Sequence, residues 1–561
     1  MEATNTPLRT GGQILVDALL AQGVDRVFCV PGESYLAALD AFYDTRVGIT
    51  ICRQEGGAAM MADAWARLTG RPGICFVTRG PGITNASPAI HIASQDSVPL
   101  IVFVGQVGRD MRHREAFQEI DYAAVFGSMT KWTVEIDDAS RIPELVHRAF
   151  MTAMNGRPGP VVVALPEDML SGEAAAAPTP YAEAVPTGPA AGSMKKLEAL
   201  LAGAKTPFAV LGGGRWSPEA VADFRRFAET FDLPVGCQFR RQMLFDSTHP
   251  NYAGDVGIGP NPELARRVRE ADVLLVVGGR MSEMPSSSYT LIDIPNPKQA
   301  LVHVHASAEE IGRVYAPTLG IHADPASFAA AAAELAPPAK IAWSNETRAA
   351  NAAYHAWSDE PAPLPGACDY GAIIAWLRDR LPDDAIICNG AGNYATWLHR
   401  YLRYRRYGTQ LAPTSGSMGY GVPAAVAAKQ LHPDRAVIAV AGDGCFMMNG
   451  QEFATAVQYD VPILVIVVDN GMYGTIRMHQ EREFPGRIIA TGLKNPDFAT
   501  LARAYGGHGE TVEATAEFAP AFERAVASGK PAIIHLKVDS EAILPTTTLS
   551  QIREKALAGT R

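Results

Sequence analysis

The stretch that decides the fold is GDGCFMMNGQEFATAVQYDVPILVIVVDNGMYG, residues 442–474. The apolar run AVIAVA before Gly442 and the run VPILVIVV before Asp469 predict two neighbouring buried strands. Asp443 and Asn470 then follow the carboxyl ends of these strands, where parallel sheets bind their ligands. Carboxylate and amide oxygens suit Mg²⁺, which leaves the rest of its octahedron to phosphates and water. The spacing therefore predicts a site for a metal and a phosphate-bearing group.

The glycines of the same turn favour an anion nearby. Gly442 and Gly444 let the backbone approach a phosphate closely, and the helix expected after them directs its first amide groups to the same place. The alternative is an ordinary strand-to-helix turn in which Asp443 caps the helix. The run DNGMYG at residues 469–474, after the second strand, favours the metal site.

Composition describes a well-buried α/β protein and argues against several other classes. The chain has 561 residues, 47% hydrophobic and 19% charged, which predicts about three or four domains. The net charge of -10 argues against a nucleic-acid surface. We see neither a membrane-spanning run nor a signal pattern, so we expect a cytoplasmic protein. Seven cysteines without CxxC spacing are expected to be small core residues rather than disulfides or zinc ligands.

An internal repeat organises the chain. A helix, a strand and a glycine turn at residues 11–32 recur in the same order at residues 370–392. Further on, the strand before Gly80-Pro81-Gly82 corresponds to the strand before Gly442-Asp443-Gly444, and VPLIVFVGQ at 98–106 corresponds to VPILVIVVDN at 461–470. Two copies of one parallel α/β domain are the simplest explanation.

A third α/β domain lies between the two copies. Residues 173–192 and 336–365 are rich in Ala and Pro, which predicts linkers, and the segment between them has its own succession of apolar strands. We therefore predict an α/β fold of three doubly wound parallel sheets. The expected boundaries are residues 1–172, 191–335 and 366–545, followed by a tail at 546–561.

The run from GDG to Asn resembles the diphosphate-binding motif of thiamine diphosphate (ThDP) enzymes. The three-domain order is also similar to that of the ThDP decarboxylase and carboligase family, over nearly the whole chain. The resemblance implies that the first domain binds the pyrimidine of ThDP and the last domain binds its diphosphate. It also implies that Mg²⁺ is held by Asp443, Asn470 and the main-chain carbonyl of Met472.

The repeat places Glu55 opposite Met418, 363 residues later. In the family the first position is the activating glutamate, and the second is a bulky apolar residue that holds the cofactor in a bent shape. A carboxyl group that favours the imino form of the pyrimidine has to be shielded from water, so Glu55 is expected to be buried. The alternatives are a carboxylate at a helix N-terminus for Glu55 and core packing for Met418.

Further cofactor contacts follow from the same resemblance. Gly392 and Asn393 would meet the diphosphate from the first strand of the last domain, and Gly444 and Cys445 would meet it from the GDG turn. The backbone around Gly416 and Met418 would hold the aminopyrimidine. Cys445 stands where many relatives carry Ser, so its backbone amide is expected to serve rather than its side chain.

Within the family, the first domain is most similar to the acetolactate synthase branch. The run AFQEIDYAAVFGSMTKW implies that Gln118 lines the reaction side of the cofactor. His113 falls near a histidine pair of simple decarboxylases, with a solvated basic turn as the alternative. After Asn470 the sequence departs from those synthases, and His479 is either an acceptor-pocket residue or a packed helix residue.

The central domain matches a flavin-binding site only in part. Acetolactate synthases carry a structural FAD in the central domain, and GGGR at 212–215 and GGRMSE at 278–283 match its surroundings in part. The run NYAGDVGIGPNP at 251–262 departs from the usual pattern. We expect FAD to be absent or weakly held.

Several functions are compatible with these features. The leading hypothesis is decarboxylation of a 2-oxoacid such as pyruvate, with transfer of the acyl carbanion to a carbonyl acceptor. The alternatives are a non-ligating 2-oxoacid decarboxylase, a 2-hydroxyacyl-CoA lyase and a non-catalytic relative. A dehydrogenase is disfavoured because no GxGxxG follows the first strand of any domain. The resemblance implies a homodimer or homotetramer with active sites shared between subunits.

Overall fold

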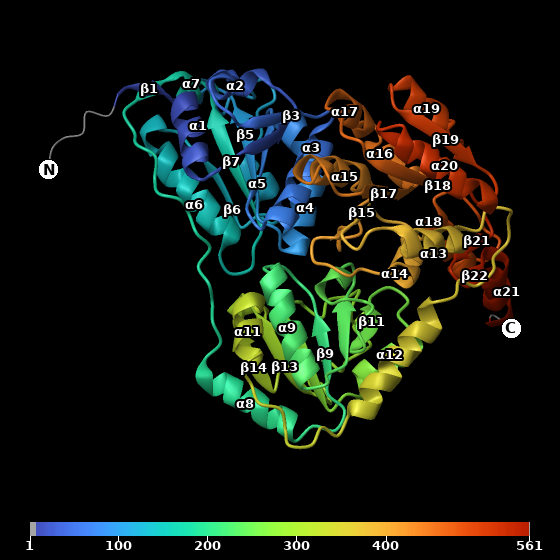
Figure 1. Cartoon of the computed structure of the whole chain (residues 1–561). Helices are drawn as coiled ribbons and strands as arrows, with labels where there is room; N and C mark the ends of the chain where they lie inside the picture. The colour runs from blue at the N-terminus through green and yellow to red at the C-terminus, as the bar shows by residue number, and fades with distance from the viewer. Residues whose placement is uncertain (1–6, 560–561) are drawn as a thin grey trace. The chain divides into compact units, whose positions relative to one another are not determined.

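The fold is built on three six-stranded sheets, in which every pair of neighbouring strands is parallel (Figure 1). The computed structural model describes residues 7–559. Two short antiparallel pairs join segments distant or adjacent in sequence: β1 (Arg9–Thr10) with β8 (Glu173–Ala174), and β21 (Ala542–Leu544) with β22 (Thr547–Thr548). The prediction of three parallel α/β domains is confirmed.

The first and third sheets have the same strand order, which confirms the internal repeat. Counted along the chain within each sheet, the order is second, first, third, fourth, sixth, fifth. The first sheet contains β2 (Arg26–Cys29), β3 (Gly48–Ile51), β4 (Gly73–Val77), β5 (Leu100–Gln106), β6 (Trp132–Glu135) and β7 (Pro160–Pro166). The third contains β15 (Ile386–Asn389), β16 (Gln410–Leu411), β17 (Val437–Gly442), β18 (Leu464–Asp469), β19 (His508–Val512) and β20 (Ala532–Lys537).

The central sheet has a different order: third, second, first, fourth, fifth, sixth. This is the order of dinucleotide-binding sheets, whose crevice lies where the strand order reverses. Its strands are β9 (Phe208–Leu211), β10 (Val235–Gln238), β11 (Tyr252–Val256), β12 (Val273–Val277), β13 (Ala300–His305) and β14 (Leu319–His322).

Helices cover both faces of the sheets, which explains why the inner strands are apolar without alternation. Every residue of β5 and β7 is buried, for example. The first domain contains α1 (Gly11–Ala21), α2 (Leu36–Tyr43), α3 (Glu55–Thr69), α4 (Gly80–Asp96), α5 (Tyr122–Phe126), α6 (Ile142–Met154) and α7 (Glu167–Ser171). The central domain contains α8 (Ala191–Ala202), α9 (Pro218–Thr230), α10 (Pro262–Glu270), α11 (Pro325–Ala332) and α12 (Ser344–Ser358).

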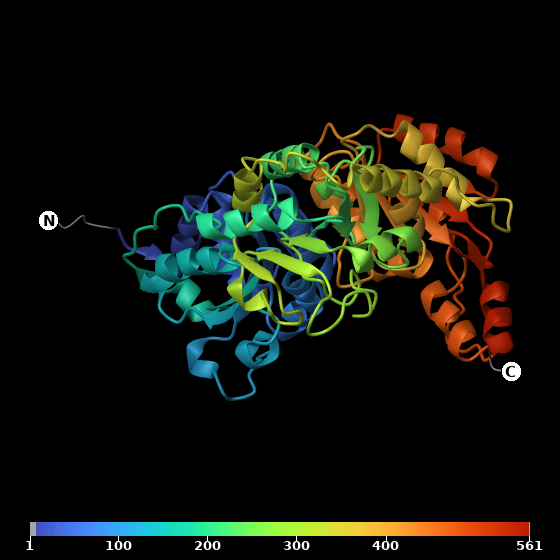
Figure 2. The same ribbon diagram turned by 90° about the horizontal axis from the view of Figure 1, so that it is seen from below.

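The third domain adds a pair of helices beside its sheet. Its helices are α13 (Tyr370–Arg380), α14 (Ala395–Tyr401), α15 (Gly421–Leu431), α16 (Asp443–Asn449), α17 (Glu452–Gln458), α18 (Gly474–Glu483), α19 (Phe498–Ala504), α20 (Thr515–Ala527) and α21 (Leu549–Gly559). Figure 2 shows α18 and α21 side by side near the C-terminal end of the traced chain.

Two segments predicted as a linker and as a C-terminal tail contain helices. Residues 336–365, predicted as a linker, include the 15-residue helix α12, whose Ala350 and Tyr354 are buried. The Ala-rich composition concealed this apolar stripe of helical spacing. Residues 546–561, predicted as a tail, contain α21, whose Leu549 is buried.

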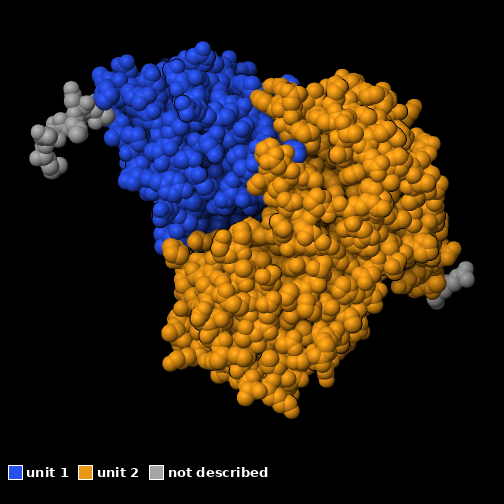
Figure 3. All heavy atoms as spheres, viewed as in Figure 1, with its two compact units in different colours: residues 1–185, 426–431 blue, residues 186–425, 432–561 orange. Residues whose placement is uncertain are grey.

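The chain divides into two compact units, residues 1–185 with 426–431 and residues 186–425 with 432–561 (Figure 3). Glu55 belongs to the first unit, whereas the GDG turn belongs to the second. Among residues 7–559, no helix combines the length and apolar character needed to cross a membrane. All seven cysteines lie in this described range, are buried, and form no disulfide.

Candidate cofactor site

The second unit contains a cavity of about 280 Å³ at the carboxyl ends of β15, β17 and β18. These three strands are neighbours in the sheet, so the loops that follow them converge. All ten residues of the third domain that the sequence assigned to the cofactor site line this cavity: Gly392, Asn393, Gly416, Met418, Gly442, Asp443, Gly444, Cys445, Asn470 and Met472.

The two expected metal ligands lie on adjacent strand ends. Gly442 pairs with Val468 in the parallel register, which brings the turn at Asp443 beside the turn at Asn470. One carboxylate oxygen of Asp443 accepts a hydrogen bond from the Gly444 amide at 2.8 Å. The side-chain oxygen of Asn470 accepts one from the Met472 amide at 3.3 Å. Both side chains are thus oriented by their own turns.

A second carboxylate stands close to Asp443. The side-chain amide of Asn495 donates to Asp443 Oδ2 at 2.7 Å and to Asp469 Oδ1 at 2.8 Å. Burial raises the pKa of Asp443, and the neighbouring Asp469 carboxyl adds to the rise. Burial also acts on Asp469, but hydrogen bonds led by His535 outweigh it and lower the pKa of that carboxyl. The paired acidic groups leave negative charge that a cation would balance.

This donor set fits a hard divalent cation. Within residues 7–559, no cluster of three or more His, Cys, Asp or Glu side chains could hold a metal by itself. A cation at this position would therefore rely on amide and carbonyl oxygens in addition to a carboxylate, as Mg²⁺ sites that also bind phosphates do. The residues present thus fit the group that the sequence predicted.

Asn393 lines the cavity, but its side chain has other partners. Its Oδ1 accepts from the Thr475 hydroxyl at 2.9 Å, and its Nδ2 donates to the Ile543 carbonyl at 3.2 Å and to the Met478 sulfur at 3.4 Å. The Asn393 amide also donates to the Thr475 hydroxyl. The side chain therefore joins the turn after β15 to α18 and β21, and the backbone of Gly392 remains the candidate for a diphosphate contact in this turn.

Cys445 is likewise part of a network between loops. Its sulfur accepts from the Gly419 amide at 3.3 Å and lies 3.4 Å from the Tyr394 hydroxyl, which accepts from the Gly390 amide at 3.0 Å. A β-carbon at Gly390 would come within 2.5 Å of this sulfur. The thiol thus packs between the loop at 390–394 and the loop at Gly419, and the backbone of Cys445 remains the candidate for a cofactor contact.

Several lining residues were not anticipated from the sequence. Tyr394, Trp397 and Tyr473 contribute aromatic surface, and Ile543 closes the wall from the C-terminal hairpin. Tyr394 directly follows Asn393 in the NGAGNY turn, and Tyr473 directly follows Met472, so proximity to the motifs could have indicated both. Ile543 lies about 70 residues beyond the nearest motif, and no local signal marks it.

In the first unit, Glu55 is the first residue of α3 and is half-buried. Its carboxylate accepts a hydrogen bond from the Asn85 side chain at 2.9 Å. A β-carbon at Gly82 would lie 3.5 Å from the same carboxylate. Glu55 is therefore not fully buried in the single chain, in contrast to the expectation from the sequence.

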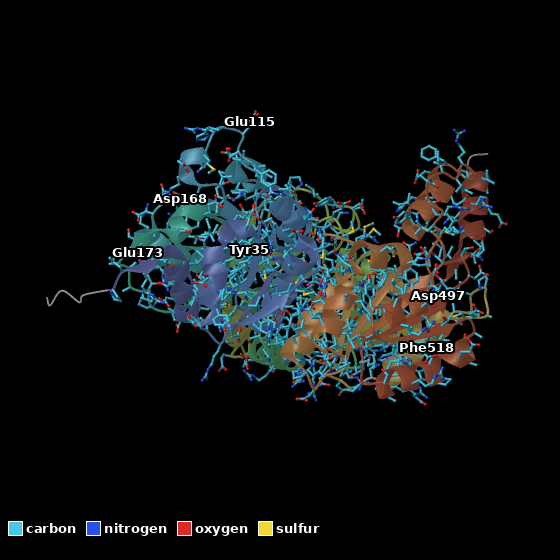
Figure 4. The ribbon with its side chains drawn as sticks, turned by 90° about the horizontal axis from the view of Figure 1, so that it is seen from above. Tyr35, Glu115, Asp168, Glu173, Asp497 and Phe518 are labelled. Carbon is cyan, nitrogen blue, oxygen red and sulfur yellow. The ribbon has the colours of Figure 1, made fainter. Side chains whose placement is uncertain are left out.

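Gln118 lies beside the same glycine turn. Its carbonyl accepts a hydrogen bond from the Gly80 amide at 3.0 Å, and its backbone is left-handed with a φ of 65°. Glu55 and Gln118 thus flank the Gly80-Pro81-Gly82 turn. His113 is exposed, also with a positive φ, on the same irregular loop. Figure 4 shows Glu115 at the outer end of this loop, away from the sheet.

His479 is not brought to the cavity. It lies on α18 with an exposed side chain, whereas Thr475 and Ile476 at the start of the same helix line the cavity. The geometry therefore supports Thr475 as a pocket residue and gives no support to His479.

Comparison with family models matches all three domains. The N-terminal TPP binding domain of thiamine pyrophosphate enzymes matches residues 9–125, their central domain matches 194–332, and their C-terminal TPP binding domain matches 390–536. The chain belongs to the thiamine pyrophosphate enzyme family. The central match contains all six strands of the second sheet, the N-terminal match contains β2 to β5 of the first, and the C-terminal match begins directly after β15.

Curated relatives place the chain in one branch of that family. The acetolactate synthase isozyme 2 large subunit of Escherichia coli is 30% identical over 534 residues, which cover 94% of this chain and 95% of that protein. Isozyme 1 of the same organism is 31% identical, covering 95% and 94%. A probable acetolactate synthase large subunit of Methanocaldococcus jannaschii is 30% identical, covering 95% and 93%. The predicted ThDP enzyme of the acetolactate synthase-like branch is confirmed.

Proposed function

We propose that this enzyme decarboxylates a 2-oxoacid such as pyruvate and transfers the acyl carbanion equivalent to a carbonyl acceptor, with Mg²⁺ beside the diphosphate. One observation carries the proposal: the metal-ligand set and both cofactor loops of the family motif line a single cavity. Similarity to acetolactate synthase large subunits along nearly the whole chain supports this reaction class.

The third domain would hold the diphosphate and the metal. Asp443, Asn470 and the carbonyl of Met472 would bind Mg²⁺, and the backbone at Gly392, Gly444 and Cys445 would face the phosphates. ThDP, when bound, supplies a nucleophilic carbon and stabilises the carbanion left by decarboxylation. Asn495 would keep the Asp443 carboxylate oriented for the metal.

The remaining predicted residues would act at the other end of the cofactor. Met418 would support the aminopyrimidine, together with the backbone at Gly416. Glu55 would hold the proton that the pyrimidine nitrogen shares, and the hydrogen bond from Asn85 fixes its orientation. Gln118, which is anchored by the Gly80 amide, would face the substrate. His113 remains a candidate for proton transfer on an exposed loop.

We also propose that the central domain lacks tightly bound FAD. The Gln238 side chain lies against two glycines, Gly212 after β9 and Gly279 after β12. A β-carbon at Gly212 would come within 2.0 Å of the Gln238 side-chain amide oxygen, and one at Gly279 within 2.1 Å. The same amide donates to the Arg280 carbonyl at 3.2 Å. This packing at the reversal point of the strand order supports weak or absent flavin binding.

The assembly and location are further proposals. We expect a cytoplasmic homodimer or homotetramer, because a shared active site would complete the shielding of Glu55 that the single chain leaves half-exposed. Sedimentation of the active enzyme tests this expectation. A fully active monomer would contradict it.

The decisive experiment for the reaction is a panel of 2-oxoacids incubated with enzyme, ThDP and Mg²⁺ and analysed by mass spectrometry. Acetolactate from pyruvate alone supports ligation. Acetaldehyde as the only product supports a simple decarboxylase instead, and cleavage of a 2-hydroxyacyl-CoA supports a lyase. If ThDP binds but no 2-oxoacid is consumed, decarboxylation is excluded.

A further inference from the structure

A buried arginine of the central domain reaches the loops of the cofactor cavity. Arg240 follows β10 and is only 3% exposed. Its Nη2 donates to the Gly390 carbonyl at 2.7 Å, and its Nη1 donates to the Pro413 carbonyl. One guanidinium group, which is always charged, therefore binds two loops of the third domain at once.

Each of these carbonyls stands at the base of a loop that lines the cavity. Gly390 is two residues before Gly392, on the diphosphate side. Pro413 is three residues before Gly416, on the aminopyrimidine side, and its carbonyl also accepts from the Gly416 amide at 3.3 Å. The two loops follow different strands, β15 and β16, so the guanidinium fixes a spacing that neither strand sets by itself.

The backbone at Arg240 adopts an unfavourable conformation. Arg240 has a φ of 59°, in the left-handed region that side chains with a β-carbon disfavour. Nearby side chains fasten the same segment to the third domain, since Gln242 donates to the His399 carbonyl at 2.7 Å and receives a hydrogen bond from Gln410 at 3.1 Å. The segment is therefore held in a disfavoured conformation that delivers the guanidinium to the loops.

We propose that Arg240 is a positioning residue that holds the loops at 390–393 and 413–418 at the separation that ThDP requires. The proposal rests on the proposed function of the cavity. It adds a contribution of the central domain to cofactor binding that does not involve a flavin.

Arg241 offers a matched control in the next position. It is also buried, at 6% exposure, and donates to the carbonyls of Gly213 at 3.1 Å and Arg240 at 2.9 Å. These acceptors belong to the central domain rather than to the cavity loops. Replacing Arg241 removes a buried charge of the same kind without removing the two loop contacts.

The first measurement is ThDP affinity, from titrations with Mg²⁺ followed by the intrinsic fluorescence of the seven tryptophans, of which Trp397 lines the cavity. Arg240→Met is expected to weaken ThDP binding about tenfold or more, since two hydrogen bonds from a charged donor are lost. Arg240→Lys keeps the charge but cannot donate to both carbonyls at once, so its ThDP affinity should lie between those of wild type and Arg240→Met. Arg241→Met should bind ThDP within about twofold of wild type.

The second measurement is hydrogen exchange of the cofactor-free protein. Peptides covering 390–394 and 413–419 should exchange faster in the Arg240 variants than in wild type and Arg241→Met. Unchanged exchange in these peptides would overturn the proposal. Equal loss of ThDP affinity in Arg240→Met and Arg241→Met would also overturn it. If Arg240→Met does not fold, the same comparisons are made with Arg240→Lys. If wild type itself binds no ThDP, the proposed function fails, whereas the exchange data still decide the role of Arg240.

Discussion

The carboxylate of Glu481 joins helix α18 to the C-terminal helix α21, and we expect the second helix to detach when this junction is weakened. Arg553 on α21 donates to both carboxylate oxygens, at 2.8 and 2.5 Å. Arg477 on α18 donates to Oε1 at 3.1 and 2.8 Å, and the Gly486 amide donates to Oε2 at 3.0 Å. The Glu481 side chain is completely buried beneath these donors.

The strength of the junction follows from the carboxyl group itself. The hydrogen bond from Arg553, together with those from Gly486 and Arg477, lowers the pKa of Glu481 from 4.5 to about 2. At about 1.4 kcal/mol per pH unit, this corresponds to roughly 3 kcal/mol in favour of the ionised form. Because the Arg553 side chain is a third exposed, solvent screening reduces the contribution of these hydrogen bonds to stability to about 2 kcal/mol.

Arg553→Gln should therefore release α21 locally rather than unfold the domain. Arg553 is the largest of three contributions to this shift, so we expect amide exchange in residues 549–559 to rise about threefold to tenfold at neutral pH, which corresponds to about 0.7–1.4 kcal/mol. The direction of the pH dependence follows from the lowered pKa. A carboxyl group whose pKa is lower in the folded state than in the unfolded state stabilises the folded state at pH values above the unfolded-state pKa. Protection of α21 in wild type should thus be complete above about pH 4.5 and fall as the pH drops towards 2.

Arg524 provides the matched control. It forms a similar fork with Glu510, at 3.0 and 2.7 Å, but its side chain is 57% exposed. Exposed pairs of this kind contribute about 0–1 kcal/mol, so Arg524→Gln should change local exchange only slightly. The reasoning is refuted if Arg553→Gln leaves exchange in 549–559 within twofold of wild type, or if both variants behave alike.

Three other outcomes are expected. Glu55→Gln should fold and bind ThDP but lose most turnover in steady-state assays, since an amide cannot exchange the proton; near-normal turnover would remove Glu55 from the mechanism. Asp443→Asn should raise the Mg²⁺ concentration for half-maximal ThDP binding about tenfold or more, because the charged ligand is lost, and an unchanged Mg²⁺ requirement would count against the site. Purified wild-type protein should show no flavin absorption band, because Gln238 occupies the crevice; a stoichiometric band would contradict the proposed loss of FAD.

The features that the sequence predicts well are those encoded within one strand and its following turn. The apolar runs before Gly442 and Asp469 determine where their strands end, so Asp443 and Asn470 could be placed beside each other without a structure. The internal repeat worked for the same reason, since each half carries its own local pattern.

The features that the sequence did not predict depend on contacts between distant segments. The Asn393 side chain forms hydrogen bonds with Thr475 and Ile543, which lie about 80 and 150 residues further along the chain. Arg240 reaches Gly390 across 150 residues. Such partners are chosen by packing, and neither spacing nor periodicity marks them. Helix α12 was missed for a different reason, because its small residues resemble those of a linker.

The wall of the cavity that Ala542 and Ile543 provide has a consequence for the timing of cofactor loading in the cell. The GDG turn and the loop at 416–418 are made about 100 residues earlier, but the pocket is not closed until the hairpin containing Ile543 has left the ribosome. A nascent chain shorter than this has the phosphate-side loops without their enclosure. We therefore expect the enclosed ThDP pocket to be complete only late in synthesis, once residue 543 has been made.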